Sequence, residues 1–120
     1  MVKDEVQRPV PLVWRSVLEG VVEAVRLGDA ARASGLPGVE PVPPNVAEQI
    51  ADSVADYGET LTRLPAAAWD TSVTLWQRDY WEVLVDLWTE PGERSDLVLH
   101  MEVREIAGSY SFRVGLVYVP

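Results

Sequence analysis

The strongest secondary-structure signal in the chain is Trp81-Glu82-Val83-Leu84-Val85-Asp86-Leu87-Trp88-Thr89. This stretch is rich in aromatic and β-branched residues, contains no glycine or proline, and sets its charged residues between apolar neighbours. Such side chains fit the pleated, half-buried surface of a sheet. The stretch therefore predicts a central β-strand, and we expect the segments on either side to cover it.

Turn signals divide the C-terminal third into further strands. Pro91-Gly92, within Glu90–Ser95, predicts a turn between the central strand and a strand over Asp96–Ile106. Gly108-Ser109 predicts a two-residue hairpin turn into a strand over Tyr110–Val119. Residues 72–76 fit either an edge strand or a helical continuation. The prediction is an antiparallel meander of three to four strands.

Two helices are predicted before the sheet. From Leu12 to about Leu27 the apolar residues are spaced by three or four. The predicted inner face of this helix consists of Val13, Val17, Val21, Ala24 and Val25. Asn45 and Glu48 suit a capping box for a second helix that ends at Gly58. The predicted fold class is α+β, with both helices packed on one face of the meander.

The length of 120 residues predicts a single domain over residues 1–120, because a chain of this size supports one hydrophobic core. Residues 1–9 are expected to be a loose N-terminal lead-in. Residues 34–44 are rich in proline and glycine and predict an irregular loop rather than a linker between domains.

The net charge of −9 is unevenly distributed. Residues 1–44 hold five basic and six acidic side chains, whereas residues 45–120 hold five basic and thirteen acidic ones. Nucleic acids and anionic membranes are recognised by clustered lysine and arginine, so neither is an expected partner. The acidic surface fits a basic protein, a cation or a metal as its partner; the alternative is that it serves only solubility.

The absence of cysteine excludes disulfides, zinc–thiolate sites and cysteine nucleophiles. The polar start Met1-Val2-Lys3-Asp4-Glu5 has no apolar core of the signal-peptide type, and no window approaches the roughly 18 apolar residues of a membrane span. The sequence predicts a cytoplasmic protein without a cofactor, although export without a classical signal stays open.

Alternation along the strands assigns their side chains to two faces. The first face is strongly apolar and contains Val83, Val85, Leu87, Leu97, Leu99, Met101, Val103, Phe112, Val114, Leu116 and Tyr118. The second is mixed and contains Glu82, Leu84, Asp86, Trp88, Asp96, Val98, His100, Glu102, Arg104, Ser111, Arg113, Gly115 and Val117. The predicted register sets Asp86 opposite His100 and Arg104 opposite Arg113. A slip of two residues would keep the faces and change every pair.

The mixed face holds the candidate binding residues Asp86, Trp88, His100, Glu102, Arg104 and Arg113. A carboxylate beside the only histidine can orient it as a general base or form a weak metal site. The spacing matches no recognised metal motif, and no nucleophile or phosphate-binding motif occurs in the chain. The simpler interpretation, a solvated charged face, is favoured over binding, and binding over catalysis.

The central stretch, followed by Arg94-Ser95-Asp96-Leu97, resembles a family of small bacterial proteins known as a domain of unknown function. The segment Asp56-Tyr57-Gly58-Glu59-Thr60-Leu61, with Leu64-Pro65 and Trp69, is also similar to that family. The resemblance covers about residues 10–120 and assigns no catalytic residue. Small acidic bacterial domains of this kind recur as immunity or antitoxin-like proteins, which is an analogy at the level of the fold.

Two functional hypotheses follow. The first is a non-catalytic protein-binding module, of the immunity or antitoxin type, whose acidic surface binds a basic protein. The second is a small-ligand or metal-binding protein that uses the polar sheet face around His100. Self-association as a homo-oligomer, through that face or a sheet edge, is a third possibility.

Overall fold

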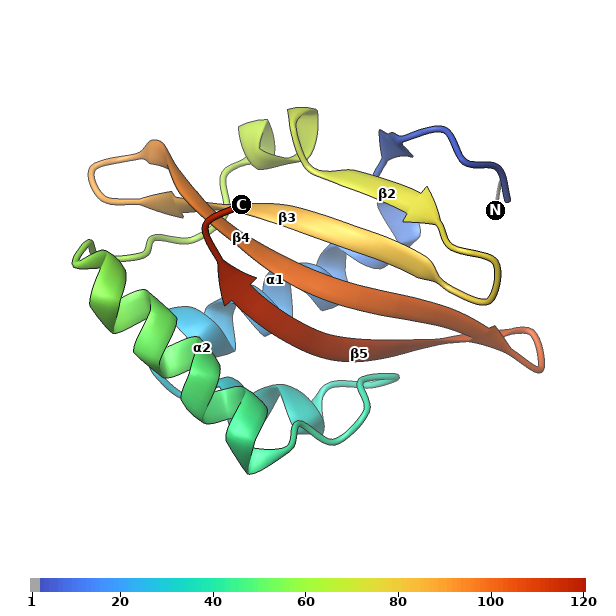
Figure 1. Cartoon of the computed structure of the whole chain (residues 1–120), viewed down its shortest axis with the longest axis horizontal. Coiled ribbons are helices and arrows are strands. Elements are labelled where there is room, and N and C mark those ends of the chain that lie inside the picture. The colour runs from blue at the N-terminus through green and yellow to red at the C-terminus, as the bar shows by residue number, and fades with distance from the viewer. Residues whose placement is uncertain (1–2) are drawn as a thin grey trace.

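A five-stranded antiparallel sheet forms the centre of the computed structural model, which describes residues 3–120 (Figure 1). The strands lie in chain order: β1 (Arg8–Pro9), β2 (Val73–Trp76), β3 (Trp81–Thr89), β4 (Glu93–Ile106) and β5 (Ser109–Tyr118). The helices are α1 (Leu12–Arg26) and α2 (Pro44–Tyr57), with 3-10 helices η1 (Ala30–Gly35) and η2 (Ala66–Asp70). The α+β class with an antiparallel meander is confirmed, but the sheet has five strands rather than three to four.

The additional strand comes from the segment predicted to be a loose lead-in. Arg8 and Pro9 pair with Thr74 and Val73 of β2. Proline lacks a backbone N–H to donate to a neighbouring strand and is therefore tolerated on an edge strand. Met1 and Val2, which belong to the same predicted lead-in, lie outside the described residues.

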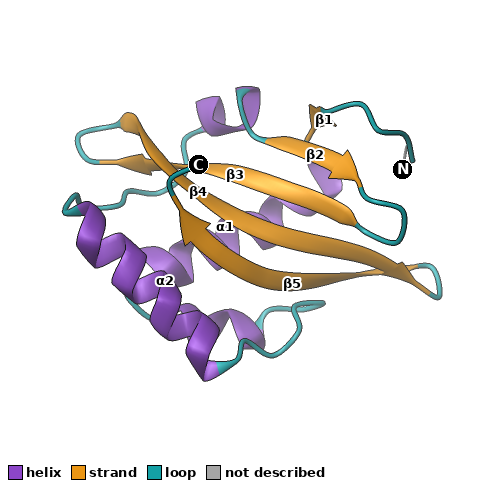
Figure 2. Ribbon diagram, viewed as in Figure 1, coloured by secondary structure: helices purple, strands orange, loops and turns teal. Residues whose placement is uncertain are grey.

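Helix α1 covers one face of the sheet and lies behind it in Figure 2. Its predicted orientation is wrong by part of a turn, because Val13 is 69% exposed whereas Trp14 and Leu18 are fully buried. The Trp14 ring packs edge-on against Trp81 and Tyr110, each at a centroid distance of 5.4 Å. Burial of this large aromatic ring sets the rotation of the helix.

Helix α2 runs alongside β5 at the border of the sheet, and its Ile50 belongs to the same core cluster as the buried residues of α1 (Figures 1 and 2). It begins at Pro44, and no side chain caps its first turn, so the predicted capping box of Asn45 and Glu48 is wrong. Its predicted end is confirmed, because Gly58 adopts a left-handed conformation with φ of 80°. Ile50 is its fully buried contact with the core.

The β4–β5 hairpin turns at Ala107 and Gly108, one residue earlier than predicted. Ile106 pairs with Ser109, and the two turn residues have φ values of 51° and 82°. A two-residue turn with positive φ at both positions matches the twist of the flanking strands. The earlier turn moves the register of the hairpin by two residues.

A bulge in β5 changes which side chains enter the core. Two residues, Gly115 and Leu116, lie opposite the single β4 residue His100. Beyond such a bulge the alternation of faces reverses. Val117 is therefore fully buried and Leu116 is 48% exposed, while Tyr118 pairs with Val98 on the face that carries Asp86, so the predicted faces of these three residues are wrong. Before the bulge the predicted apolar face is confirmed: Val83, Val85, Leu87, Leu97, Leu99, Met101, Val103, Phe112 and Val114 are buried.

Loops and side chains occupy hydrogen-bonding groups along β5, at one border of the sheet, and at the end of β3. Along β5, the Phe112 backbone bonds to Gly38 and Glu40, and the Gln49 side chain both donates to the Val117 carbonyl oxygen and accepts from its N–H. Beyond the start of β2, the loop residues Thr60 and Thr62 bond to the backbone of Glu90 and Trp88 at the end of β3. Occupied edges hinder pairing with a further strand. No helix within residues 3–120 is long and apolar enough to cross a membrane.

Candidate functional site

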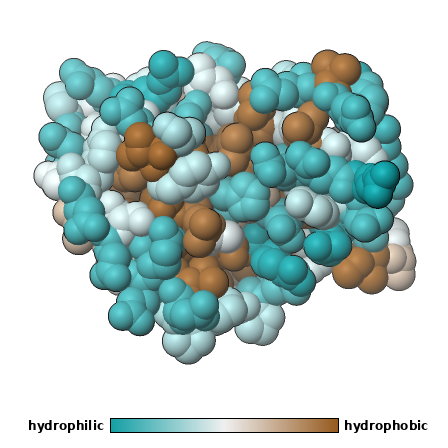
Figure 3. All heavy atoms as spheres, in the orientation of Figure 1, coloured by the Kyte–Doolittle hydropathy of each residue, from teal (hydrophilic) through white to brown (hydrophobic). Residues whose placement is uncertain are grey.

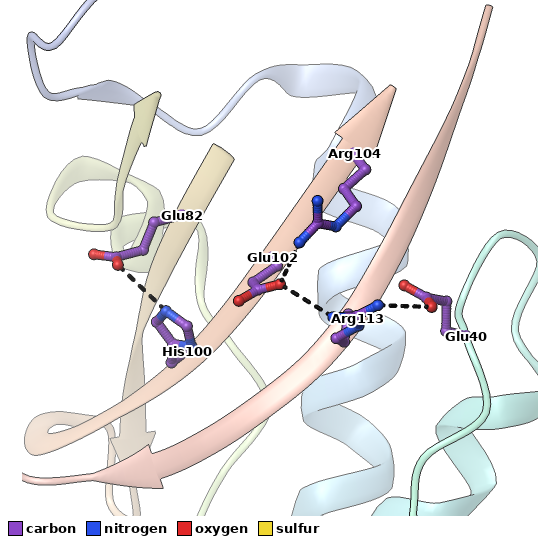
Figure 4. Close-up of polar contacts among 6 residues, drawn as sticks. All are labelled: Glu40, Glu82, His100, Glu102, Arg104 and Arg113. Carbon is purple, nitrogen blue, oxygen red and sulfur yellow. Dashed lines mark hydrogen bonds and ion pairs between the residues drawn. The ribbon is translucent and has the colours of Figure 1, made fainter. Parts of the chain in front are cut away.

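The sheet face opposite α1, called here the open face, carries the candidate residues of the sequence. All six lie on it, half-buried or exposed, and Figure 3 shows polar and apolar side chains interspersed across this side of the molecule. They come from three adjacent strands: Asp86 and Trp88 from β3, His100, Glu102 and Arg104 from β4, and Arg113 from β5. Figure 4 shows the polar contacts at one end of this face.

The β3–β4 register separates Asp86 from His100. Asp86 lies opposite Val98, and the residue opposite His100 is Leu84. The predicted pairing of Asp86 with His100 is therefore wrong by two residues. The turn is tighter than predicted, with Thr89 paired to Glu93, and a bulge follows between Asp86 and Trp88.

His100 contacts Glu82 instead. Its Nε2 atom lies 3.4 Å from a Glu82 carboxylate oxygen, with the two side chains 22% and 30% exposed (Figure 4). On the other side, Gly115 leaves room for the imidazole, because a β-carbon at this position would lie 2.7 Å from His100 Nδ1. The histidine is thus held between a carboxylate and a glycine, and the contact becomes an ion pair when the imidazole is protonated.

The glutamate opposite Glu82, Glu102, is neutralised by two arginines. Its Oε2 atom lies 3.4 Å from Arg104 Nη2 and 3.6 Å from Arg113 Nη1. Arg113 lies directly opposite Glu102, so the predicted opposition of Arg104 and Arg113 is wrong. The earlier hairpin turn thereby replaces a repulsive pair with an attractive one.

Two further residues complete this network. Glu40, from the loop before α2, bonds to Arg113 at 3.3 Å (Figure 4). The guanidinium carbon of Arg104 lies 4.9 Å from the centre of the Tyr80 ring, a cation–π contact. Glu40 is 73 residues from its partner in sequence, and no local pattern in its loop signals the contact.

The other end of the open face is different in character. The Asp86 carboxylate forms no ion pair or hydrogen bond with any described residue, whereas the Asp86 backbone N–H donates to Ser72 Oγ at 3.0 Å. The Trp88 indole nitrogen is shielded from solvent and has no hydrogen-bond partner within residues 3–120. Asp86 lines a shallow hollow of about 290 Å³ together with Asp96, Val98 and Val119. The six predicted residues therefore form two groups, a neutralised one around Glu102 and an unpaired one at Asp86 and Trp88.

The geometry limits the chemistry of this face. Nowhere among the described residues do three histidine, aspartate or glutamate side chains gather in a way that could hold a metal ion. A single histidine–carboxylate contact provides fewer ligands than divalent ions take in proteins. The arrangement is suited to ion pairing and hydrogen bonding with a partner molecule.

The comparisons with known proteins identify a family whose function is unknown. The family model described as a domain of unknown function, DUF7668, matches residues 22–120, and the chain therefore belongs to this family. No curated protein and no solved structure matches the chain.

Proposed function

We propose that this DUF7668 protein is a non-catalytic protein-binding module whose acidic surface binds a basic protein. A cytoplasmic location and a role of the immunity or antitoxin type, in which a small acidic protein occupies a basic partner, are parts of the same proposal. The proposal rests on acidic side chains that are exposed and unpaired and that do not stabilise the fold.

The observation that carries the proposal is the acidic side of α2. Glu48, Asp52 and Asp56 are exposed, follow one another at a spacing of four residues, and form no ion pair with any residue in 3–120. Like charges at this spacing destabilise a helix by about 0.2–0.5 kcal/mol per pair. Asp56 also lies in the last turn, where the helix dipole disfavours an acid. A basic partner would convert these costs into attraction.

The β5 border of the sheet and the end of β3 support a surface-to-surface mode of binding there. The β5 edge is occupied by Gln49 and residues 38–40, and the end of β3 by residues 60–62. A partner that adds a strand needs free backbone groups at an edge. Side chains of α2 and of the open face remain available to a partner without any rearrangement of the fold.

The metal or small-ligand alternative has less support. It was centred on Asp86, His100 and Glu102, which the register separates into different contacts. We therefore propose protein binding alone.

The test is affinity capture from the native cell at low and at high salt. We expect the wild-type protein to capture a basic protein at low salt and to lose it at high salt. The variant Glu48→Gln, Asp52→Asn, Asp56→Asn should lose the partner at both. A control with the same change of charge, Glu19→Gln, Asp29→Asn, Asp70→Asn, removes exposed acids elsewhere and should retain it. Absence of a basic partner, or equal loss in the control, would contradict the proposal.

A further inference from the structure

Two shallow hollows meet at the C-terminal end of β5. One, of about 320 Å³, is lined by Asp56 and Tyr57 of α2 together with Tyr118 and Val119. The other, of about 290 Å³, is lined by Asp86, Asp96 and again Val119. Both hollows share Val119, and the Asp96 N–H of one donates to the Tyr57 hydroxyl oxygen of the other at 3.0 Å, so the two hollows adjoin each other. We call Asp56, Tyr57, Asp86, Asp96, Tyr118 and Val119 the Val119 surface.

The centre of the Val119 surface is apolar and accessible. Val119 is 54% exposed, and Tyr57 and Tyr118 are half-buried beside it. Leu116, two residues before Tyr118, is 48% exposed because of the β5 bulge. The last residues of the chain run back over the open face toward β3, which brings this apolar group next to Asp86 (Figure 1). Apolar and aromatic side chains in the middle of a polar rim are typical of protein-binding surfaces.

The charges around this centre are predominantly negative and unpaired. Asp56, Asp86 and Asp96 form no ion pair within the described part of the chain, and one exposed cation, Arg94, lies among them. At the opposite end of the open face, Glu82 and Glu102 already contact His100 and arginines. A cationic partner therefore gains more at the Val119 surface than at the Glu102 end.

We propose that the Val119 surface is the docking site of a lysine- or arginine-bearing segment of the basic partner. This inference rests on the proposed function and specifies which part of the protein surface binds the basic partner. Lysine and arginine can lay their aliphatic stems on Tyr118 and Val119 while their charged ends reach the surrounding carboxylates. A second copy of this chain is a poorer occupant, since it would bring the same acids and a net charge of −9.

The experiment is an NMR titration of the isotope-labelled protein with two synthetic peptides. One consists of leucine and lysine, and the other has glutamate in place of every lysine. We expect the basic peptide to shift the backbone resonances of Asp56, Asp86, Asp96 and residues 116–119, and the acidic peptide to shift none. The affinity for the basic peptide should fall steeply with added salt.

A pair of matched variants tests the location. The double variant Asp86→Asn, Val119→Ser should bind the basic peptide with about tenfold lower affinity, because it loses one charge and one apolar contact at the interface. Asp29→Asn with Val13→Ser removes an exposed acid and an exposed apolar residue elsewhere and should leave the affinity unchanged. All four positions are accessible and none of these side chains has a polar partner. Both variants should therefore keep the wild-type fold, so that their spectra differ from that of the wild type only near the substituted residues.

The outcomes separate this inference from the proposed function. Shifts centred on Glu82, His100 and Arg113, or equal weakening in both variants, would overturn the Val119 surface and leave a basic partner in place. If the basic peptide bound nowhere, or bound no better than the acidic one, both proposals would fail.

Discussion

Gly115 lies so close to His100 that a β-carbon at this position would stand 2.7 Å from both the Nδ1 atom and the carbonyl oxygen of the histidine. The contact includes backbone atoms, which cannot rotate away as a flexible side chain can. The glycine is therefore needed for close approach at the β5 bulge.

The first prediction concerns this contact. Gly115→Ala should destabilise the protein by about 1–3 kcal/mol, the usual cost of overpacking a well-packed site. Gly35→Ala is the control, because no atom lies within 4 Å of its added β-carbon. Chemical denaturation of both variants checks the prediction, and equal stabilities would show that β5 can move away from His100.

The second prediction concerns the edge of β5. Gln49→Ala removes both side-chain bonds to the Val117 backbone, at 2.9 and 3.3 Å. We expect a loss of about 1–2 kcal/mol and a tendency to self-associate through the freed strand edge. Denaturation and light scattering measure the two effects. Gln7→Ala, at an exposed glutamine without a side-chain bond, should produce neither.

The third prediction compares two carboxylates of the open face. Glu102→Gln weakens the contacts to Arg104 and Arg113 and should cost about 0.5–1 kcal/mol, a modest amount because these groups are partly solvated. Asp86→Asn breaks no ion pair and should change the stability by less than about 0.5 kcal/mol. Thermal denaturation of the two variants and the wild type measures both losses of stability. A larger loss for Asp86→Asn would mean that this carboxylate serves the fold rather than a partner.

The fourth prediction concerns acid stability. The hydrogen-bonded Arg26 guanidinium, with a smaller contribution from Arg63, lowers the pKa of Glu23 from its ordinary value of 4.5. A lowered pKa in the folded state contributes stability above the unfolded pKa, and this contribution is lost as the pH falls through the folded value. The free energy of unfolding of the wild type should therefore exceed that of Glu23→Gln by a few tenths of a kcal/mol at neutral pH. The difference should shrink below about pH 4.5.

Denaturation at a series of pH values measures this difference. The control is Glu19→Gln, because Glu19 is an exposed glutamate on the same helix without an ion pair. The stability of this control should depend on pH in the same way as that of the wild type. A difference for Glu23→Gln that stays constant into acid would contradict the role of the ion pair.

The candidate site illustrates how far sequence patterns reach. Alternation correctly assigned all six candidate residues to the open face, because side chains alternate between the two faces along a regular strand and none of the six lies beyond the β5 bulge. It did not assign their partners. A slip of two residues conserves every face, and both hairpins differ from the predicted register by such a slip near the site.

Distant contacts had no local signal at all. Glu40 reaches Arg113 across 73 residues, and Gln49 reaches Val117 across 68. Neither residue lies in a motif, and each contact exists because α2 and the loop before it pack along β5.

The sequence by itself determined the elements whose causes are local: the central strand at Trp81–Thr89, the end of α2 at Gly58, and the α+β class with an antiparallel sheet. Propensity, alternation and a glycine with positive φ act within a few residues and can be read directly. Only the tertiary structure decided the rotation of α1, the two bulges and the separation of Asp86 from His100. These depend on how the Trp14 ring and the tight turns fit into one common core, which no single segment encodes.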